Sequence, residues 1–255
     1  MTPMEEQRLI LQRVLDSGRS QAARNRLGQF ATPPALAAEI LTYAQRLMPN
    51  GVGIRFLDPA FGTGAFYGAL LATFPQALIE SAIAYEVDSD FAEAARSVWK
   101  GHHIQVVNED FTMAQPHTNP ALLPNLLICN PPYVRHHHIG SEDKARLKAT
   151  AASIAGLRMS GLSGLYCYFM VLSHLWMGEK GVAGWLVPSE FMEVNYGSEL
   201  KRYLLEKVTL LHIHRFDPND VQFDDALVSS SVVWIRNETP SKDHSVSLSF
   251  GGSLL

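Results

Sequence analysis

The chain has 255 residues, of which 47% are hydrophobic and 18% are charged, so it can bury a sizeable core and is not a disordered or low-complexity protein. Its 21 basic and 25 acidic residues give a net charge of −4, which excludes an overall positive field of the kind that attracts nucleic acids. The two cysteines, Cys129 and Cys167, lie in apolar segments without the spacing of metal ligands. No run approaches the roughly 18 apolar residues of a membrane-spanning helix, and the first residues do not resemble a signal peptide. We therefore expect a soluble, cytoplasmic protein without a membrane partner.

Charge is distributed unevenly along the chain. Residues 50–133 contain three basic and eight acidic residues, whereas residues 134–160 contain five basic and two acidic residues, next to the histidine run His136–His138. An acidic region followed by a basic loop suggests two ligands of different charge. The alternative is that charges simply fall unevenly over a solvated surface.

Helical and strand patterns alternate along most of the chain. An amphipathic helix is predicted at 4–17, and Thr32-Pro33-Pro34 begins another that extends to about residue 47, because threonine caps helices and proline suits their first turn. Short apolar runs then predict strands at Ile54–Leu57, Ala82–Tyr85, Ile104–Val107, Leu126–Cys129, Val182–Val187, Leu210–His214 and Ser231–Ile235. Helical stretches at 64–76, 89–99, 141–152 and 165–177 separate the first five of these runs.

This alternation predicts an α/β fold. Strands separated by helices form crossover units, so we expect a doubly wound, mostly parallel, seven-stranded sheet covered by helices on both faces. No helix separates the last two runs, which predicts an antiparallel hairpin at one edge. The Ser-rich tail beyond residue 237 contains one further alternating stretch, at 246–250.

Acidic residues stand where successive predicted strands end. Asp58 begins a glycine-rich turn at 58–64, Glu86 follows the second strand, and Asp110 follows the third beside Phe111. Ligands of doubly wound sheets bind at this edge, where an acid commonly accepts hydrogen bonds from ribose hydroxyls. Each acid alone is also compatible with a helix cap. Three together fit a nucleoside with a cationic amino-acid tail better than a dinucleotide with its pyrophosphate.

The fourth predicted strand ends in Asn130-Pro131-Pro132-Tyr133. Two consecutive prolines stiffen the loop and remove two backbone donors, so the Asn130 amide and the backbone carbonyls are left to face a ligand. This is an acceptor array suited to an amino group with two hydrogens, beside an aromatic ring that can stack on a flat base. A purely structural Pro-Pro turn is the alternative.

These motifs resemble the catalytic domain of the gamma-class adenine-specific DNA methyltransferases of restriction–modification systems, of the Eco57I and TaqI type. The resemblance covers about residues 27–236. Gly28–Pro33 resembles the family's first cofactor motif, with Ala31 where a second aromatic is usual, and Asp58–Phe66 resembles its glycine motif, with Phe61 where cysteine is frequent. Asn130–Tyr133 resembles its Asn-Pro-Pro-Tyr motif. That tetrapeptide also occurs in methyltransferases for protein glutamine and for RNA, but the preceding Gly-Gln-Phe-x-Thr-Pro block makes the combination specific.

The resemblance implies the fold of class I S-adenosylmethionine-dependent methyltransferases, with methyl transfer from that cofactor to the amino group of a flipped-out adenine in double-stranded DNA. The implied catalytic residues are Asn130, Pro131, Pro132 and Tyr133. The implied cofactor-binding residues are Phe30, Ala31, Thr32, Asp58, Pro59, Ala60, Gly62, Gly64, Glu86, Val87, Asp110, Phe111 and Asn130. Tyr133 is expected to stack on one face of the target base, and Phe191 or Tyr196 on the other.

Several alternatives remain open at this stage. The acceptor could instead be an adenine in RNA or a protein glutamine amide, and a third possibility is a non-catalytic, methyltransferase-like DNA-binding subunit. Arg135, His136 and Lys144 are candidates for contacts with DNA phosphates, whereas a solvated loop is the alternative for the histidine run. We expect no metal site, because three adjacent histidines cannot converge on one ion from an extended loop.

The expected domain organisation has three parts. Residues 1–27 form a helical extension, 28–237 the methyltransferase domain, and 238–255 a tail or the start of a target-recognition region that is missing here. The expected partners are double-stranded DNA and a target-recognition domain, a specificity subunit or a cognate endonuclease. The sequence does not show which DNA site is read.

Overall fold

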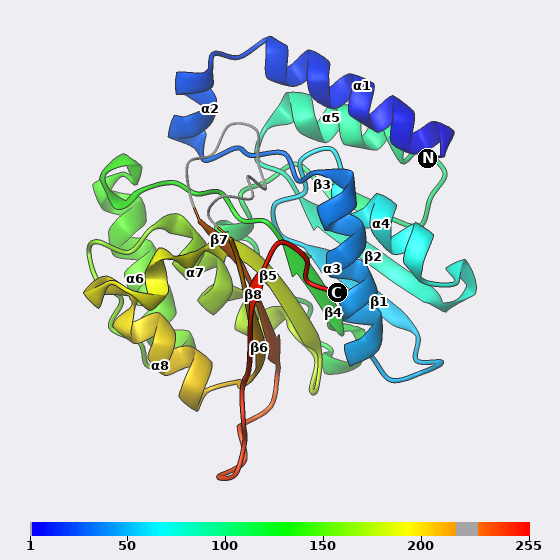
Figure 1. Cartoon of the computed structure of the whole chain (residues 1–255). Helices are drawn as coiled ribbons and strands as arrows, with labels where there is room; N and C mark the ends of the chain where they lie inside the picture. The colour runs from blue at the N-terminus through cyan, green and yellow to red at the C-terminus, as the bar shows by residue number, and fades with distance from the viewer. Residues whose placement is uncertain (1, 218–228) are drawn as a thin grey trace.

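The computed structural model describes residues 2–217 and 229–255 (Figure 1). The helices are α1 (Pro3–Ser17), α2 (Gln21–Leu27), α3 (Pro34–Leu47), α4 (Ala65–Thr73), α5 (Ser89–Val98), α6 (Ser141–Ala155), α7 (Leu165–Leu172) and α8 (Ser198–Glu206). The strands are β1 (Ile54–Asp58), β2 (Ile79–Tyr85), β3 (Gln105–Val107), β4 (Leu126–Cys129), β5 (Val182–Pro188), β6 (Thr209–Phe216), β7 (Ser230–Arg236) and β8 (Ser247–Gly251). The predicted helices are confirmed, except that α7 ends at Leu172 and continues as a 3-10 turn at Ser173–Trp176.

The strands form one mixed sheet in the order β3-β2-β1-β4-β5-β7-β6-β8. The first five are parallel, and β7 lies antiparallel between β5 and β6. The predicted α/β class, with a mostly parallel sheet and an antiparallel β6–β7 pair, is therefore confirmed. The strand order reverses between β1 and β4, which is where doubly wound sheets bind their ligands.

The sheet carries one strand more than predicted. The alternating stretch in the tail forms β8, which pairs in parallel with β6 and becomes the outer strand at that end of the sheet. The hairpin is therefore not the edge itself. Leu248 and Phe250 of β8 are exposed, so the hydrophobic pattern of this stretch does not mark a core strand.

Helices cover both faces of the sheet and create two hydrophobic cores. Side chains that alternate along β1 and β4 point to opposite sides, as strand geometry requires. Phe56 and Ile128 pack in the core beneath α3, α4 and α5, whereas Leu57 and Cys129 pack in the core beneath α6, α7 and α8. Burial of both faces explains why β4 is apolar throughout, whereas β1 also carries Arg55 and Asp58.

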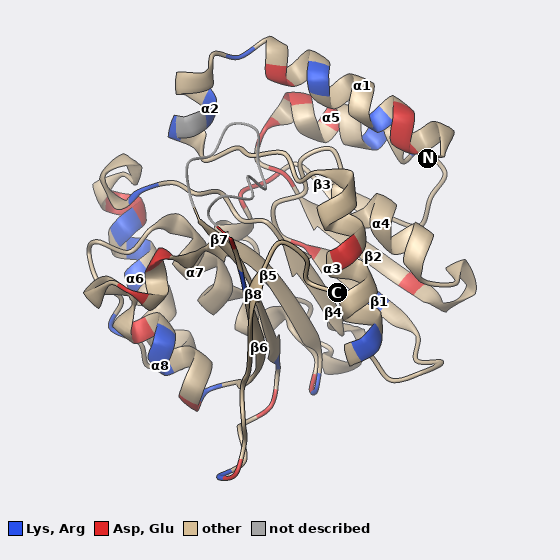
Figure 2. Cartoon of the chain, in the orientation of Figure 1, with Lys and Arg blue, Asp and Glu red and all other residues tan. Residues whose placement is uncertain are grey.

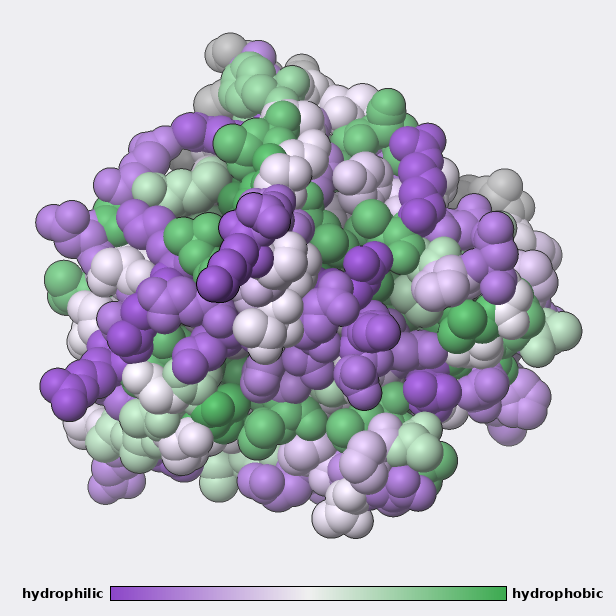
Figure 3. Space-filling view, turned by 90° about the horizontal axis from the view of Figure 1, so that it is seen from below, coloured by the Kyte–Doolittle hydropathy of each residue, from purple (hydrophilic) through white to green (hydrophobic). Residues whose placement is uncertain are grey.

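The N-terminal helices lie outside these layers. In Figure 1, α1 runs beside α5, and α2 leads the chain back towards the sheet before α3 begins. Most charged residues lie on helices and loops rather than on the strands (Figure 2). The face shown in Figure 3 mixes hydrophilic with hydrophobic residues. In the part of the chain that the structure describes, no helix is long and apolar enough to cross a membrane.

Candidate active site

A cavity of about 510 Å³ lies where the parallel strands end. Its size is within the usual range for small-molecule sites. The loops that follow β1, β2, β3 and β4 line it together with the segment before α3, so the structure brings together residues from five separate parts of the sequence. The lining includes these residues that the sequence singled out: Phe30, Ala31, Pro59, Ala60, Gly62, Glu86, Val87, Asp110, Phe111, Asn130 and Pro132.

Glu86, which follows β2, is held in the cavity lining by two hydrogen bonds. Its Oε2 accepts a hydrogen bond from the Gly62 backbone N–H at 2.7 Å, and its Oε1 accepts one from the Asp88 N–H at 2.9 Å. Burial raises the pKa of Glu86, while these two hydrogen bonds oppose the rise. A carboxylate has about four acceptor positions, so two remain for donors such as ribose hydroxyls.

Asp110 and Phe111, which follow β3, form another part of the cavity lining. Asp110 Oδ1 accepts hydrogen bonds from the backbone N–H and the hydroxyl of Thr112, both at 2.8 Å. Its Oδ2 lies 4.0 Å from Arg146 Nη2, beyond hydrogen-bond distance. Phe111 is held by the rings of Tyr85, Phe169 and Trp176. This corner offers an acceptor and an aromatic ring, which suits a planar base that carries an amino group.

Asp58 does not line this cavity, although it ends β1. Its side chain is 1% exposed, and its Oδ1 accepts a hydrogen bond from the Ala60 N–H at 3.1 Å. Burial raises the pKa of Asp58 to about 8. The carboxyl group therefore lies beneath the glycine-rich turn and is mostly protonated at neutral pH. Its role in binding the cofactor remains a prediction.

The two glycines of the turn have different surroundings. Both adopt positive φ, +57° at Gly62 and +93° at Gly64. A Cβ at Gly62 would meet nothing within 4 Å, which leaves that side of the turn open, whereas a Cβ at Gly64 would lie 2.4 Å from Trp99 Nε1. Gly64 therefore allows close packing at the start of α4, and only Gly62 of the pair lines the cavity.

Asn130 is oriented by the segment before α3. Its Nδ2 donates to the Phe30 carbonyl at 3.0 Å and to Thr32 Oγ1 at 3.1 Å. Both amide hydrogens are used in this way, so the Oδ1 atom remains as a hydrogen-bond acceptor. The Gly28–Pro33 block and the Asn-Pro-Pro-Tyr loop, which are separate motifs in the sequence, are thus directly hydrogen-bonded to each other.

Gly28 allows these two segments to meet. It has φ +64°, and its carbonyl accepts a hydrogen bond from the Tyr133 N–H at 3.2 Å. A Cβ at this position would lie 2.3 Å from the Tyr133 nitrogen. Only glycine fits here, because any side chain would push the two segments apart.

The three predicted aromatic residues differ in exposure. Tyr133 is 9% exposed, and its hydroxyl donates to the Leu186 carbonyl at 3.1 Å. Phe191 is 1% exposed and packs in the core with α7 and α8, so its ring does not face solvent in this conformation. Tyr196 is half-buried, on the 3-10 turn before α8. It is the more accessible of the two candidates for the second face of a base.

The basic loop lies at the rim of the site. Arg135 is exposed, His136 is half-buried in a 3-10 turn, and Lys144 is half-buried in the first turns of α6. His138 contributes to the cavity lining. Within the described ranges, no three His, Cys, Asp or Glu side chains are grouped so that they could hold a metal ion.

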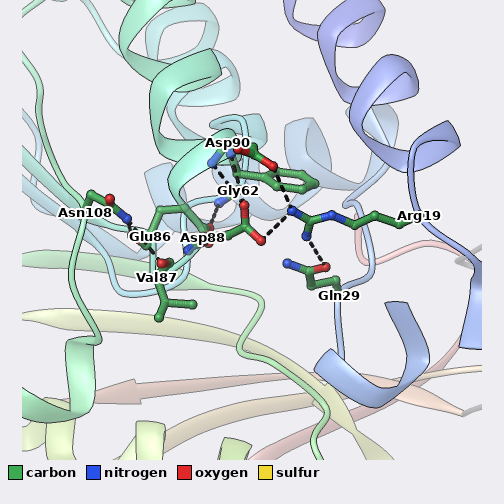
Figure 4. A network of polar contacts seen from close by, with 9 residues as sticks. Arg19, Gln29, Gly62, Glu86, Val87, Asp88, Asp90 and Asn108 are labelled. Atoms are coloured by element: carbon green, nitrogen blue, oxygen red, sulfur yellow. Dashed lines mark hydrogen bonds and ion pairs between the residues drawn. The ribbon is translucent and has the colours of Figure 1, made fainter. Parts of the chain in front are cut away.

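Sequence patterns did not reveal the contribution of the N-terminal helices. Gln12 and Asp16 of α1 line the cavity. Arg19 forms an ion pair with Asp88 at 2.6 Å and donates to Gln29 at 2.9 Å, which joins the start of α5 to the segment before α3 (Figure 4). Only the amphipathic pattern of 4–17 hinted that this helix packs against the domain.

The site therefore fits a nucleoside. Glu86 provides acceptors for ribose hydroxyls, Asp110 and Phe111 suit an adenine ring, and the exposed Val87 adds an apolar contact. The Gly62 N–H, the backbone donor at the cavity side of the glycine-rich turn, is bonded to Glu86 and is therefore not available to a pyrophosphate.

Solved structures define the class of fold. A Listeria monocytogenes protein assigned to the class I S-adenosylmethionine-dependent methyltransferases matches with a TM-score of 0.74 at 17% identity, over 98% of this chain and 74% of that one. DrdV, solved in complex with DNA, matches with a TM-score of 0.72 at 17% identity, over 100% of this chain and 31% of that one. The fold is that of class I S-adenosylmethionine-dependent methyltransferases.

Sequence comparisons show which family the chain is similar to. Residues 125–222 match the model of the Eco57I restriction-modification methylase family. The type II methyltransferase M.AccI from Acinetobacter calcoaceticus is 30% identical over 216 residues, which cover 84% of this chain and 38% of that protein. M.XamI from Xanthomonas campestris pv. amaranthicola is 29% identical over 216 residues, which cover 83% of this chain and 39% of that protein. Residues 125–222 thus match the Eco57I family of restriction-modification methylases, and the chain spans about two-fifths of the length of the type II methyltransferases to which it is similar.

Proposed function

We propose that this chain transfers a methyl group from S-adenosylmethionine to the exocyclic amino group of an adenine in double-stranded DNA, as the modification activity of a restriction–modification system. The orientation of Asn130 carries the proposal. Because Phe30 and Thr32 hold both of its amide hydrogens, its Oδ1 presents an acceptor to the site. An acceptor that cannot turn to become a donor favours a substrate amino group over a carbonyl.

The chemistry requires positioning and electrostatics rather than a covalent intermediate with the protein. S-adenosylmethionine, when bound, supplies an electrophilic methyl group on a sulfonium. Asn130 Oδ1 and the Pro131 carbonyl accept hydrogen bonds from the target amino group, which draws its nitrogen towards tetrahedral geometry and directs its lone pair at the methyl group. Fixed acceptors of this kind stabilise the positive charge that develops on the nitrogen.

The target base must leave the duplex to reach Asn130, at a cost of a few kcal/mol. Tyr133 and Tyr196 stack on the extruded base, each contributing roughly 1–3 kcal/mol. Leu186 anchors the Tyr133 hydroxyl, so the ring is held at its far edge. Glu86, Asp110 and Phe111 hold the adenosine part of the cofactor.

The names of the relatives support DNA as the acceptor. M.AccI and M.XamI are type II methyltransferases, and DrdV was solved on DNA. Arg135, His136 and Lys144 contact phosphates beside the extruded base in this proposal. Because the relatives are more than twice as long as the matched region, the proposal includes a target-recognition region, specificity subunit or endonuclease that reads the DNA sequence.

Methyl transfer from tritium-labelled cofactor to duplex DNA, RNA and protein tests the proposal. We expect label in the adenine of duplex DNA alone. Asn130→Ala should lower the transfer rate at least about 100-fold, whereas its affinity for S-adenosylhomocysteine in calorimetry should change little. Asn119→Ala, which alters an exposed asparagine outside the site, is the control. Label in RNA or protein but not in DNA, or full activity of Asn130→Ala, would refute the proposal.

A further inference from the structure

A second, smaller cavity of about 50 Å³ adjoins the first. It shares six lining residues with the large cavity: Gln12, Phe30, Ala31, Ala60, Gly62 and Asn130. Its remaining walls come from α1, Thr32, the glycine-rich turn and the start of α4. By volume it has room for about three to five water molecules, or for a small group such as a carboxylate. Asp110 and Phe111 line only the large cavity, whereas Asn130 lines both.

Arg8 is the only charged side chain among the described residues that line this small cavity. It is 1% exposed, so its guanidinium is removed from solvent. A buried charge is costly unless it is paired and hydrogen-bonded. Its partners therefore show whether it serves only the packing of α1 or also faces a ligand.

The guanidinium of Arg8 is held by two residues. Its Nε donates to Glu5 Oε2 at 2.8 Å, its Nη2 donates to Glu5 Oε1, and its Nη1 donates to Thr63 Oγ1 at 3.1 Å. Arginine has five N–H donors, so two of them have no partner among the described residues. These two belong to Nη1 and Nη2.

The same contacts show that this arrangement is built into the fold. Thr63 Oγ1 donates to Gln12 Oε1 at 2.8 Å, which joins α1 to the glycine-rich turn. Glu5 approaches α4 at Gly68, where a Cβ would lie 2.9 Å from its Oε2. The position of Arg8 is therefore set from α1, from the turn and from α4, before any ligand is present.

We infer that Arg8 binds the carboxylate of the amino-acid tail of S-adenosylmethionine; this inference rests on the proposed function. With the adenosine part beside Glu86, Asp110 and Phe111, and the reacting methyl group beside Asn130, the tail extends to the small cavity. There the Arg8 guanidinium, which is paired with Glu5, offers its two remaining N–H donors, and hydrogen bonds between a carboxylate and a guanidinium are among the strongest that proteins form. Arg8 precedes the Gly28–Pro33 block and lies outside the motifs that the sequence revealed.

A pair of ligands that differ only in the carboxylate tests this inference. Calorimetry of the whole chain would measure the affinity for S-adenosylhomocysteine and for its decarboxylated analogue. The wild-type chain should prefer the carboxylate-bearing ligand roughly 10- to 100-fold, the range expected for hydrogen bonds to charged groups. Arg8→Met should reduce this preference to less than about 3-fold, by weakening S-adenosylhomocysteine and not its analogue.

Two further variants separate binding from packing. Arg13→Met changes an exposed arginine of the same helix and should keep the wild-type preference. Arg8→Lys keeps the charge but not the fork of donors, and should give an intermediate preference; it also serves if Arg8→Met does not fold, as judged by circular dichroism. If the folded variants at position 8 lose affinity for both ligands equally, Arg8 is only a packing residue and the inference is wrong.

The wild-type result distinguishes this inference from the proposed function. Equal, measurable affinity for the two ligands would overturn the role of Arg8 and leave the proposed function standing. No binding of either ligand would overturn the proposed cofactor, and the inference with it.

Discussion

The candidate site has two walls of different origin. The strand-end wall consists of the loops after β1 to β4 and carries Glu86, Asp110 and Asn130. The N-terminal wall consists of α1, α2 and the segment before α3, and carries Arg8, Gln12 and Phe30. The first wall carries acidic side chains, whereas the second carries Arg8, a buried guanidinium that is paired with Glu5.

The difference shows how far a local pattern can specify a site. A residue directly after a strand of a parallel sheet lies at the ligand-binding edge wherever the strand itself lies in the sheet. A residue on α1 reaches the site only because the helix docks at one particular angle and register. That docking depends on the hydrogen bond from Arg8 to Thr63. It also depends on Gly68, because a side chain at this position of α4 would collide with Glu5.

The most severe break in the N-terminal wall is Gly28→Ala. The new Cβ would meet the Tyr133 backbone and displace the Phe30–Thr32 segment from Asn130. Misplacement of catalytic groups by about 1 Å can cost about 100-fold in rate, so methyl transfer should fall at least that much. Radiolabel transfer to DNA measures the loss.

Gly51→Ala is the matched control for this variant. Gly51 also has positive φ, +74°, but a Cβ there would meet nothing within 4 Å. Gly51→Ala should therefore lower the free energy of unfolding only by the roughly 1–2 kcal/mol that a left-handed backbone conformation costs a non-glycine residue, without loss of activity. Equal activity of the two variants would show that Gly28 does not hold the two walls together.

The strand-end wall is tested by Glu86→Gln. An amide at this position cannot accept from Gly62, Asp88 and two ribose hydroxyls together, so the affinity for S-adenosylhomocysteine should fall roughly 10- to 100-fold in calorimetry. Glu109→Gln, which removes a charge from an exposed residue of the same cavity, should change affinity less than about 3-fold. A similar loss in both variants would mean that the overall negative charge matters rather than the hydrogen bonds of Glu86.

A smaller effect is expected beneath the strand-end wall, at Asp58. Its pKa is raised from 3.8 to about 8 in the folded protein, so the folded state retains a proton that the unfolded state releases between these values. The free energy of unfolding of the wild-type protein should therefore fall as pH rises from about 4 to 8. Asp58→Asn should raise the melting temperature at pH 8 by several degrees and leave it nearly unchanged at pH 4. A constant difference across this range would contradict the raised pKa.

The sequence predicted much of the fold and of the strand-end wall for identifiable reasons. The central strands β4 and β5 are apolar throughout because both of their faces are buried, and Asn130–Tyr133 forms a specific pattern together with the Gly28–Pro33 block. The sequence did not predict the pairing of β8, because its Leu248 and Phe250 are exposed and no buried face fixes a partner strand. It also did not predict that Phe191 packs inwards, since the side of a short turn on which a ring lies depends on neighbouring helices.

The sequence by itself determined the order of strands and helices along the chain and the acids at the strand ends. These features are local, because hydrophobic periodicity and backbone conformation act over a few residues. Tertiary structure alone decided that Arg8 is buried at the site while Arg13, on the same helix, is exposed. Both are arginines in a polar helix, and only the packing of α1 against the glycine-rich turn and α4 makes one of them a candidate for ligand binding.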